Sequence, residues 1–261
     1  MEWLADISGV MRRVFAPRTK GASFPRTCSL CGYRGWFWPA GRPQRIDVRC
    51  PRCGSTERSR LMALWLDRHG QRLSSASVLH FAPEPCLARL LRSRTGKHVS
   101  ADIVPGRADR VIDIEAIDSP ADAFDCIVCS HVLEHVDDRL ALAEIHRVLR
   151  PNGTALIMLP VIEGWARTYE RDDLRTPEER KRHFGQADHL RFYGADVRER
   201  ISSAGFGLEE FTAEGEDVVT YGLQRGEKLF IARKKDSRAG LEPSATRRSP
   251  PPASEASVGE D

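Results

Sequence analysis

The chain of 261 residues has no apolar run long enough to cross a bilayer, and its first residues lack the pattern of a secretory signal peptide. Without such a signal, its seven cysteines indicate reduced thiols rather than a disulfide framework. We therefore expect a cytoplasmic protein in which one sizeable core is accompanied by a small module.

The chain also lacks a strong net charge, since its formal charge is only +3. Residues 1–60 nevertheless hold twelve Lys or Arg against four Asp or Glu, a formal +8, and the other 201 residues hold 28 against 33, a formal −5. This basic part is suited to attract a polyanion such as RNA or a phosphorylated sugar carrier. The alternative is that its arginines are simply solvated.

Four cysteines form two Cys-x-x-Cys pairs separated by 18 residues, a spacing typical of a zinc ribbon. Four thiolates fill the tetrahedral shell of one Zn²⁺ ion, so we expect a structural ion with no open position for catalysis. The predicted ligands are Cys28, Cys31, Cys50 and Cys53. The pair Cys126 and Cys129 has the same spacing, but it lies in a predicted strand whose residues three apart point to opposite faces, so we interpret both as core thiols.

Aromatic side chains are concentrated between the two cysteine pairs, at Tyr33, Trp36, Phe37 and Trp38. Such rings can stack on nucleic-acid bases. Alternatively, they pack the ribbon against a helix predicted from Thr56 to His69.

Beyond the ribbon, short apolar runs of β-forming residues alternate with helical segments, which predicts a doubly wound α/β sheet. The helix after Val132–His135 is expected to begin with a cap at Asp137 or Asp138. After a short helix near 195–204, two further strands predict an antiparallel pair at the end of the sheet. The predicted strands are 77–82, 98–102, 109–113, 124–129, 154–160, 206–211 and 228–232.

This layout resembles the class I S-adenosylmethionine-dependent methyltransferases over residues 76–235. The resemblance is based on Phe124-Asp125 at the start of the fourth strand, Val132-Leu133-Glu134-His135 after it, and Arg147-Val148-Leu149-Arg150-Pro151-Asn152-Gly153 before the fifth. It implies a Rossmann-like sheet of seven strands, with the last pair antiparallel, and S-adenosylmethionine as cofactor.

In this family, an acidic residue ending the second strand binds the ribose hydroxyls, a role that the resemblance assigns to Asp102. The acidic residue after the third strand accepts a hydrogen bond from the adenine amino group and matches Asp113, with Glu115 as a neighbour that could replace it. The alternative for both carboxylates is a solvated group or a helix cap. The cofactor-binding residues that we predict are His80, Ala82, Glu84, Asp102, Asp113, Ile114 and Ser130.

The turn after the first strand departs from the family pattern. His80 stands in place of an acidic residue, and Ala82, Glu84 and Cys86 stand where glycines are expected, which removes easy access to positive φ. Glu84 either accepts a hydrogen bond from the amino group of the cofactor or lies in the first turn of the next helix.

We predict the acceptor pocket beyond the fourth and fifth strands. The segment 163–170 is expected to be helical, and residues 183–194 gather two histidines, an Asp, an Arg and a Tyr. His189 is suited to take a proton, Asp188 to orient it and Arg191 to hold an anionic group, unless the segment is a hydrogen-bonded structural corner. His131 completes the predicted catalytic set, while His135 is expected to cap its loop.

The predicted organisation follows from these segments. Trp3, Leu4, Ile7, Val10, Met11, Val14 and Phe15 recur at helical spacing, so the first segment is expected to be an amphipathic helix that docks on its own domain, with contact to a membrane surface left open. The predicted domains are the helix at 1–20, the ribbon at 24–56, a connecting helix at 57–75, the methyltransferase domain at 76–235 and a disordered tail at 236–261.

Three functions are compatible with this sequence. The first is methyl transfer to a polar acceptor, a small molecule or a glycan, for which the polar insert could close a pocket. The second is methylation of ribosomal or transfer RNA held by the basic ribbon. The third is a non-catalytic binding protein that kept the fold and lost the cofactor, which the glycine-free turn favours.

Overall fold

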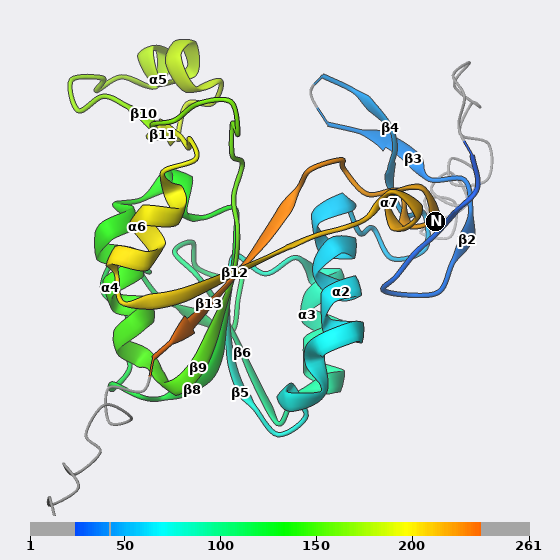
Figure 1. Cartoon of the computed structure of the whole chain (residues 1–261), viewed down its shortest axis with the longest axis horizontal. Helices are drawn as coiled ribbons and strands as arrows, with labels where there is room; N and C mark the ends of the chain where they lie inside the picture. Colours follow the sequence, from blue (N-terminus) through cyan, green and yellow to red (C-terminus); the bar gives the residue numbers. More distant parts are fainter. Residues whose placement is uncertain (1–23, 42, 236–261) are drawn as a thin grey trace, which may run out of the picture.

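The computed structural model describes residues 24–41 and 43–235 (Figure 1). The amphipathic helix predicted at 1–20 and the tail predicted at 236–261 lie outside the described residues. Among the helices that are described, none combines the length and the apolar character needed to span a bilayer.

A seven-stranded sheet forms the centre of the molecule, with the order β12-β13-β9-β8-β5-β6-β7. The strands from β9 to β7 are parallel to one another, and β13 runs antiparallel to both β9 and β12. The predicted fold class, with its antiparallel last pair, is thus confirmed. The strands are β5 (Ser77–Phe81), β6 (Lys97–Asp102), β7 (Arg110–Val111), β8 (Phe124–Ser130), β9 (Leu149–Met158), β12 (Phe206–Thr212) and β13 (Lys228–Lys234).

Helices cover both faces of the sheet (Figure 1). α4 (Asp138–Val148) and α6 (Val197–Ser203) lie on one face, and α2 (Glu57–His69) and α3 (Pro85–Arg94) lie on the other. Each face has its own apolar cluster, and Cys129 belongs to one of them whereas Cys126 belongs to the other. The two thiols therefore point to opposite faces of β8 as predicted, and burial raises the pKa of Cys126 to about 12.

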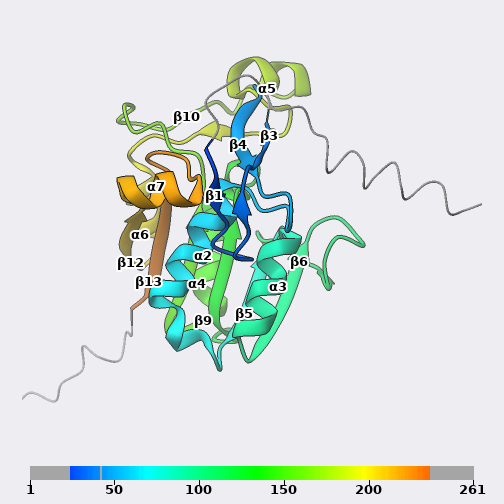
Figure 2. The same cartoon turned by 90° about the vertical axis from the view of Figure 1, so that its right-hand side faces the viewer.

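The amino-terminal ribbon consists of two small antiparallel pairs that lie against α2 (Figure 2). Its strands are β1 (Arg26–Thr27), β2 (Arg34–Gly35), β3 (Trp38–Ala40) and β4 (Arg45–Arg49). The fully buried Arg60 of α2 donates to the backbone carbonyls of Val48 and Ser55 in the ribbon, at 2.8 and 2.9 Å, and to those of Tyr221 and Gly222 beside it. One guanidinium thus joins the ribbon to the large domain.

Tyr221 is the last residue of α7 (Gly215–Tyr221), and Gly222 follows it. The sequence did not predict this helix, which lies between the last two strands. It was missed because Gly215 and the acidic residues around it are typical of a loop.

The insert between β9 and α6 differs from its prediction. The segment 163–170 is not helical: it forms turns and ends in β10 (Tyr169–Glu170), which pairs with β11 (Arg191–Phe192). The helix of the insert is α5 (Pro177–Phe184), which begins with a capping box between Thr176 and Glu179. The prediction was wrong because a charged composition alone does not make a helix: Gly164 favours a turn, and the helix cap lies further on, at Thr176.

Candidate functional site

A cavity of about 580 Å³ lies where β5, β6 and β8 end at their carboxyl termini. Ligands of open α/β sheets bind at this edge, and the volume is in the range of small-molecule sites. The residues that line it are Phe81, Ala82, Asp102, Ile103, Val104, Arg107, Ile112, Asp113, Ile114, Glu115, His131, Val132, His135, Val136, Arg180 and Asp188.

Asp102 is the last residue of β6 and lines this cavity. Its Oδ1 accepts a hydrogen bond of 2.8 Å from the backbone N–H of Val104, which fixes the carboxylate. Ile103 and Val104 beside it are 62% and 40% exposed, although they are apolar. A carboxylate next to exposed apolar side chains suits a nucleoside, whose hydroxyls need an acceptor and whose base needs an apolar surface.

Asp113 also lines the cavity and stands between the buried Ile112 and Ile114. Its Oδ1 accepts from the backbone N–H of Glu115 at 2.9 Å. The carboxylate of Glu115 is engaged at 2.7 Å by the backbone N–H of Asp137, just before α4, so it is less free than Asp113 to bind a ligand. Asp137 itself caps α4 through the N–H groups of the first turn, as predicted.

The turn after β5 keeps the backbone shape of a glycine turn without the glycine. Ala82 adopts φ +45° and lines the cavity, a conformation that costs an alanine about 1–2 kcal/mol. The replacement of glycine by alanine in this turn therefore does not block the cavity.

The other two residues predicted in this turn are not among the cavity lining. His80 is fully buried within β5, with its Nδ1 3.3 Å from Nε2 of His98, so its prediction as a cofactor-binding residue is corrected. Glu84 is the N-cap residue of α3, and Nε of Arg58 donates to its carboxylate at 2.8 Å. Ser130 is also buried, at the end of β8, and does not line the cavity.

His131 follows β8 with φ +55° and faces the cavity. Its Nδ1 is 3.1 Å from Oε1 of Glu134, and its Nε2 is 3.9 Å from Oε1 of Glu227. Burial alone would lower the pKa of His131, but the two carboxylates outweigh it and raise the pKa to about 9. His131 is consequently an imidazolium at neutral pH, which suits the role of a hydrogen-bond donor and not that of a base.

The predicted acceptor segment packs against the loop after β8. His189 is 4% exposed, and its ring contacts that of His135 edge to face at 4.6 Å between centroids. Asp188 lines the cavity and places Oδ2 3.3 Å from Nδ1 of His135, not of His189. Burial lowers the pKa of His189, so this histidine is neutral at pH 7.

Arg191 lies in β11 and contacts the loop after β8. Its guanidinium is buried and donates to the backbone carbonyls of Leu133 and Val136, at 2.9 and 2.6 Å, and to the carboxylate of Glu170 at 3.0 Å. These contacts hold the loop after β8, so Arg191 positions that loop, and its binding of an anionic group stays a prediction.

Two carboxylates beside His131, one buried and one half-buried, were not predicted. Glu134 is 1% exposed and Glu227 is 14% exposed, and each keeps one carboxylate oxygen without a hydrogen-bond partner in the described part of the chain. The spacing of Glu134 to His131 is visible in the sequence, but Glu227 reaches the site from the start of β13, which no local pattern reveals.

The four cysteines of the ribbon, which we call the thiolate cluster, meet as predicted. Sγ of Cys28 is 3.6 Å from that of Cys53, and Sγ of Cys31 is 3.7 Å from that of Cys50. Four sulfurs at about 2.3 Å from one Zn²⁺ ion lie about 3.8 Å apart, so the arrangement fits the ion. Burial raises the pKa of the Cys31 thiol to about 11, which favours the protonated thiol. A bound cation would offset this by stabilising the thiolate.

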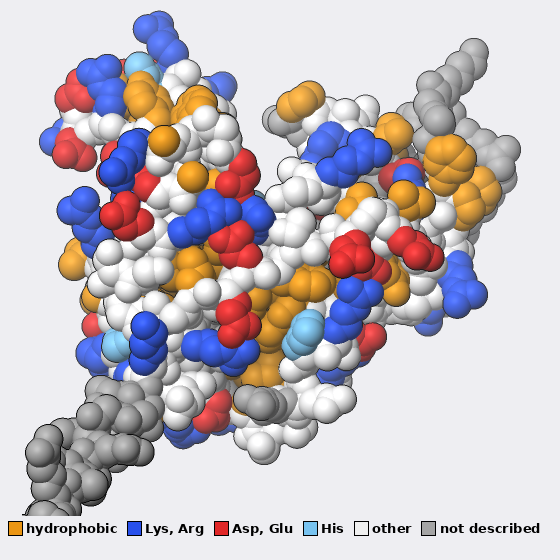
Figure 3. All heavy atoms as spheres, in the orientation of Figure 1, with side chains coloured by type: hydrophobic (Ala, Val, Ile, Leu, Met, Phe, Trp, Pro, Cys, Tyr) orange, Lys and Arg blue, Asp and Glu red, His pale blue; other side chains and the backbone are white. Residues whose placement is uncertain are grey.

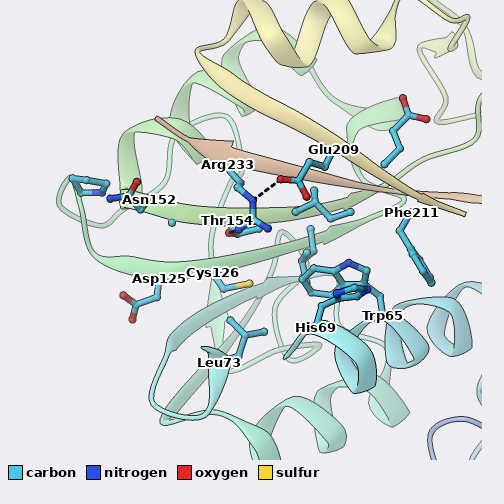
Figure 4. A pocket seen from close by; sticks show the side chains of 15 residues that line it. Trp65, His69, Leu73, Asp125, Cys126, Asn152, Thr154, Glu209, Phe211 and Arg233 are labelled. Atoms are coloured by element: carbon cyan, nitrogen blue, oxygen red, sulfur yellow. Dashed lines mark hydrogen bonds and ion pairs between the residues drawn. The ribbon is translucent and has the colours of Figure 1, made fainter. Parts of the chain in front are cut away.

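A second cavity of about 580 Å³ lies between α2 and the antiparallel end of the sheet (Figures 3 and 4). Figure 3 shows apolar side chains exposed there, and Figure 4 shows Trp65, His69 and Phe211 on one side and the ion pair of Arg233 with Glu209 on the other. Asp125 and Cys126 place it at the amino end of β8, so it is remote from Asp102 and His131.

Residues 61–157 match the family model described as a methyltransferase domain. Among solved structures, the YcgJ protein from Bacillus subtilis is 14% identical, with 67% of this chain and 98% of that chain covered and a TM-score of 0.47. The 1,6-didemethyltoxoflavin-N1-methyltransferase of Burkholderia thailandensis, solved with S-adenosylhomocysteine, is 21% identical over 67% of this chain and 77% of that chain, with a TM-score of 0.45. No curated protein matches the sequence.

Proposed function

We propose that this enzyme, which carries a class I S-adenosylmethionine-dependent methyltransferase domain, transfers a methyl group to a hydroxyl of a polar small molecule or glycan. The observation that supports this most is the content of one cavity. Asp102 and Asp113, the residues expected to hold the cofactor, line it together with His131 and Asp188, the residues expected to face the acceptor.

The residues present fit the cofactor. Asp102 would accept from the ribose hydroxyls, Asp113 from the adenine amino group, and the exposed Ile103 and Val104 would contact the base. When bound, the cofactor supplies a methyl group that is already activated by its sulfonium. The protein therefore needs mainly to orient the acceptor and remove its proton.

The groups on the acceptor side have complementary charge states. His131 is protonated and can donate a hydrogen bond to the acceptor, whereas the carboxylate of Asp188, which also lines the cavity, can accept one from it. An acceptor with polar hydroxyls matches this mixture better than an apolar one. Arg191 and Tyr193, which bind the loop carbonyls, would keep these groups in place.

We propose that the thiolate cluster binds one structural Zn²⁺ ion. Its four sulfurs fill the coordination shell, and the hydroxyl of Ser55 lies 3.3 and 3.2 Å from Sγ of Cys28 and Cys53. A hydroxyl that donates to a metal-bound thiolate is a typical outer contact of such a site.

The ribbon offers weaker support for RNA as the acceptor. Phe37 is buried against Arg60, and Arg26 and Arg45 pair with Asp47 and Glu57, so much of the basic and aromatic content is structural. The exposed Trp36, at 47%, keeps this second candidate open to test.

Calorimetric titration with S-adenosylhomocysteine, followed by transfer of a labelled methyl group to sugars, polyols and total RNA, tests the proposal. We expect one cofactor per chain and labelling of a hydroxyl compound. Binding without labelling of any hydroxyl compound, but with labelling of RNA, would replace the first candidate by the second, and absence of binding would contradict both.

A further inference from the structure

Three side chains beside the cavity bring together ligand atoms of the kinds found in catalytic metal centres. Glu134 and His135 belong to the short 3₁₀ turn η2 (Leu133–His135), and His189 comes from the insert. One ligand atom of each lies within 4.8 Å of those of the other two. We propose that these residues, which we call the imidazole cluster, bind a divalent metal ion that contacts the methyl acceptor.

Two buried atoms of this cluster have no partner in the described part of the chain. Oε2 of Glu134 and Nδ1 of His189 are both inaccessible to solvent and without a hydrogen bond, and the two side chains are only 1% and 4% exposed. Native proteins give nearly all buried polar atoms a hydrogen-bond partner, and an atom that ligates an ion is one recognised exception. A cation between these atoms would satisfy both.

The groups around the cluster are those that orient metal ligands. Oε1 of Glu134 is held by Nδ1 of His131 at 3.1 Å, which leaves Oε2 for an ion. Oδ2 of Asp188 lies 3.3 Å from Nδ1 of His135, so this carboxylate stands on the Nδ1 side of the ring and leaves Nε2 for an ion. A carboxylate behind a ligating histidine fixes its tautomer and raises its basicity.

The backbone holds the two ligand-bearing segments together. The N–H of Leu190 donates to the carbonyl of Glu134 at 2.8 Å, and Arg191 donates to the carbonyls of Leu133 and Val136. The hydroxyl of Tyr193 lies 3.0 Å from the same Leu133 carbonyl. His189 is thus kept beside η2 by four contacts that do not depend on an ion.

The ligand set suggests the class of ion and its use. Two imidazoles and one carboxylate suit Zn²⁺, Fe²⁺, Co²⁺ or Mn²⁺ better than Mg²⁺ or Ca²⁺, and three protein ligands leave open positions. The role of the ion rests on the proposed function: His135 and Asp188 line the cavity, so an acceptor there could bind the ion through its hydroxyl oxygen.

The transfer step is then a single displacement at the methyl carbon. The ion lowers the pKa of the hydroxyl, whose proton leaves to solvent. The oxygen forms a bond to the methyl carbon while the carbon–sulfur bond breaks, and the sulfur keeps the electron pair and becomes a neutral thioether.

Cobalt binding by the full chain tests this site. The zinc-loaded protein is first treated with a weak chelator, which clears metal sites other than the thiolate cluster. It is then dialysed against Co²⁺ at a series of concentrations from about 1 to about 100 µM, and its content of both metals is measured. We expect one Co²⁺ per chain in addition to the retained zinc, with visible bands typical of nitrogen and oxygen ligands. Glu134→Gln and His189→Gln should each bind Co²⁺ at least about tenfold more weakly.

His183→Gln is the matched control, because His183 lies in the same insert but contacts the hydroxyl of Tyr169 at 2.7 Å and not the cluster. It should bind Co²⁺ like the wild type. A wild type that retains no second ion, or a folded His189→Gln that binds Co²⁺ as tightly as wild type, would overturn the site. If Glu134→Gln fails to fold, the Co²⁺ content of the wild type and the Co²⁺ affinity of His189→Gln still test the site.

S-adenosylhomocysteine binding is measured on the same samples. Cofactor binding without a second ion would remove the metal site and leave the proposed function intact. A second ion without cofactor binding would remove the proposed function and leave the metal site.

Discussion

The thiolate cluster and the imidazole cluster differ in ligand chemistry, in completeness and in position. The thiolate cluster offers four soft sulfurs and lies in the ribbon, whereas the imidazole cluster offers two nitrogens and one oxygen beside the main cavity. A closed shell of four ligands stabilises structure, while three ligands leave room for a substrate. The number of ligands and their distance from the cavity thus separate a structural centre from a candidate catalytic one.

Beside each cluster lies one buried arginine that donates to backbone carbonyls. Arg60 binds the carbonyls of Val48 and Ser55 beside the thiolate cluster, and Arg191 binds that of Leu133 beside the imidazole cluster. The guanidinium suits both places because it stays charged when buried and offers several donors in one plane. The difference between the clusters therefore lies in their ligands and not in the way they are supported.

The largest effect is expected when the thiolate cluster loses a ligand. Cys50→Ser should release the zinc and lower the free energy of unfolding by at least about 3 kcal/mol, because the binding energy of a structural ion is part of the folding energy. Metal analysis and urea denaturation measure both effects. Cys86→Ser, which changes a buried thiol outside the cluster, is the control and should keep its zinc; a Cys50 variant with full zinc content would contradict the assignment.

The next largest effect is expected for the arginine that supports this cluster. Arg60→Met should lower the free energy of unfolding by roughly 3–5 kcal/mol, because four backbone carbonyls lose their donor. Urea denaturation compares it with Arg68→Met, which breaks an exposed pair with Asp217 and should cost less than about 1 kcal/mol. Equal effects of the two changes would show that the ribbon is not joined to the domain through Arg60.

A smaller effect, on binding rather than on folding, is expected at the cavity. Asp102→Ala should weaken S-adenosylhomocysteine binding by about 1.5–3 kcal/mol, the range for a lost hydrogen bond to a charged group. Asp118→Ala, which removes a 96% exposed carboxylate outside the cavity, should bind like the wild type in calorimetry. Unchanged affinity of a folded Asp102 variant would show that β6 does not form the ribose site.

The last effect is absent at neutral pH and appears only as the pH falls; it concerns a histidine that belongs to neither cluster. Burial lowers the pKa of His80 to about 3, below the usual value of 6.5, so the unfolded chain takes up this proton at a higher pH than the folded chain. His80 should therefore destabilise the fold by up to about 1.4 kcal/mol for each pH unit between 6.5 and 3, and not at all above 6.5. The free energy of unfolding of His80→Leu, measured from pH 7 to pH 4.5, should fall less steeply than that of the wild type; parallel curves would contradict the burial of a neutral His80.

The sequence predicted those parts of the molecule that depend on local patterns. The sheet, the cap at Asp137, the meeting of the four cysteines and the opposite orientation of Cys126 and Cys129 follow from periodicity, capping and spacing. The helix predicted at 163–170 was wrong because composition does not determine whether a charged segment is held by a helix or by a strand pair.

The candidate site was harder to predict because its members come from distant segments. Glu134 is close to His131 in the sequence, but its approach to His189 depends on how the insert packs on the loop after β8. Arg191 was expected to face a ligand, since the sequence does not reveal that backbone carbonyls of a loop 55 to 58 residues earlier use its donors. His80 was placed in the site by the family pattern, whereas its position within β5 directs it into the core.

The central claim is that the imidazole cluster serves the acceptor and does not support the fold or the cofactor. Calorimetric titration of His189→Gln with S-adenosylhomocysteine, read together with its melting temperature, tests this directly. We expect an affinity within about twofold of wild type and a melting temperature lowered by no more than a few degrees, since the backbone contacts of Leu190 and Arg191 remain. A parallel loss of affinity and melting temperature would contradict the claim and make this segment a structural corner.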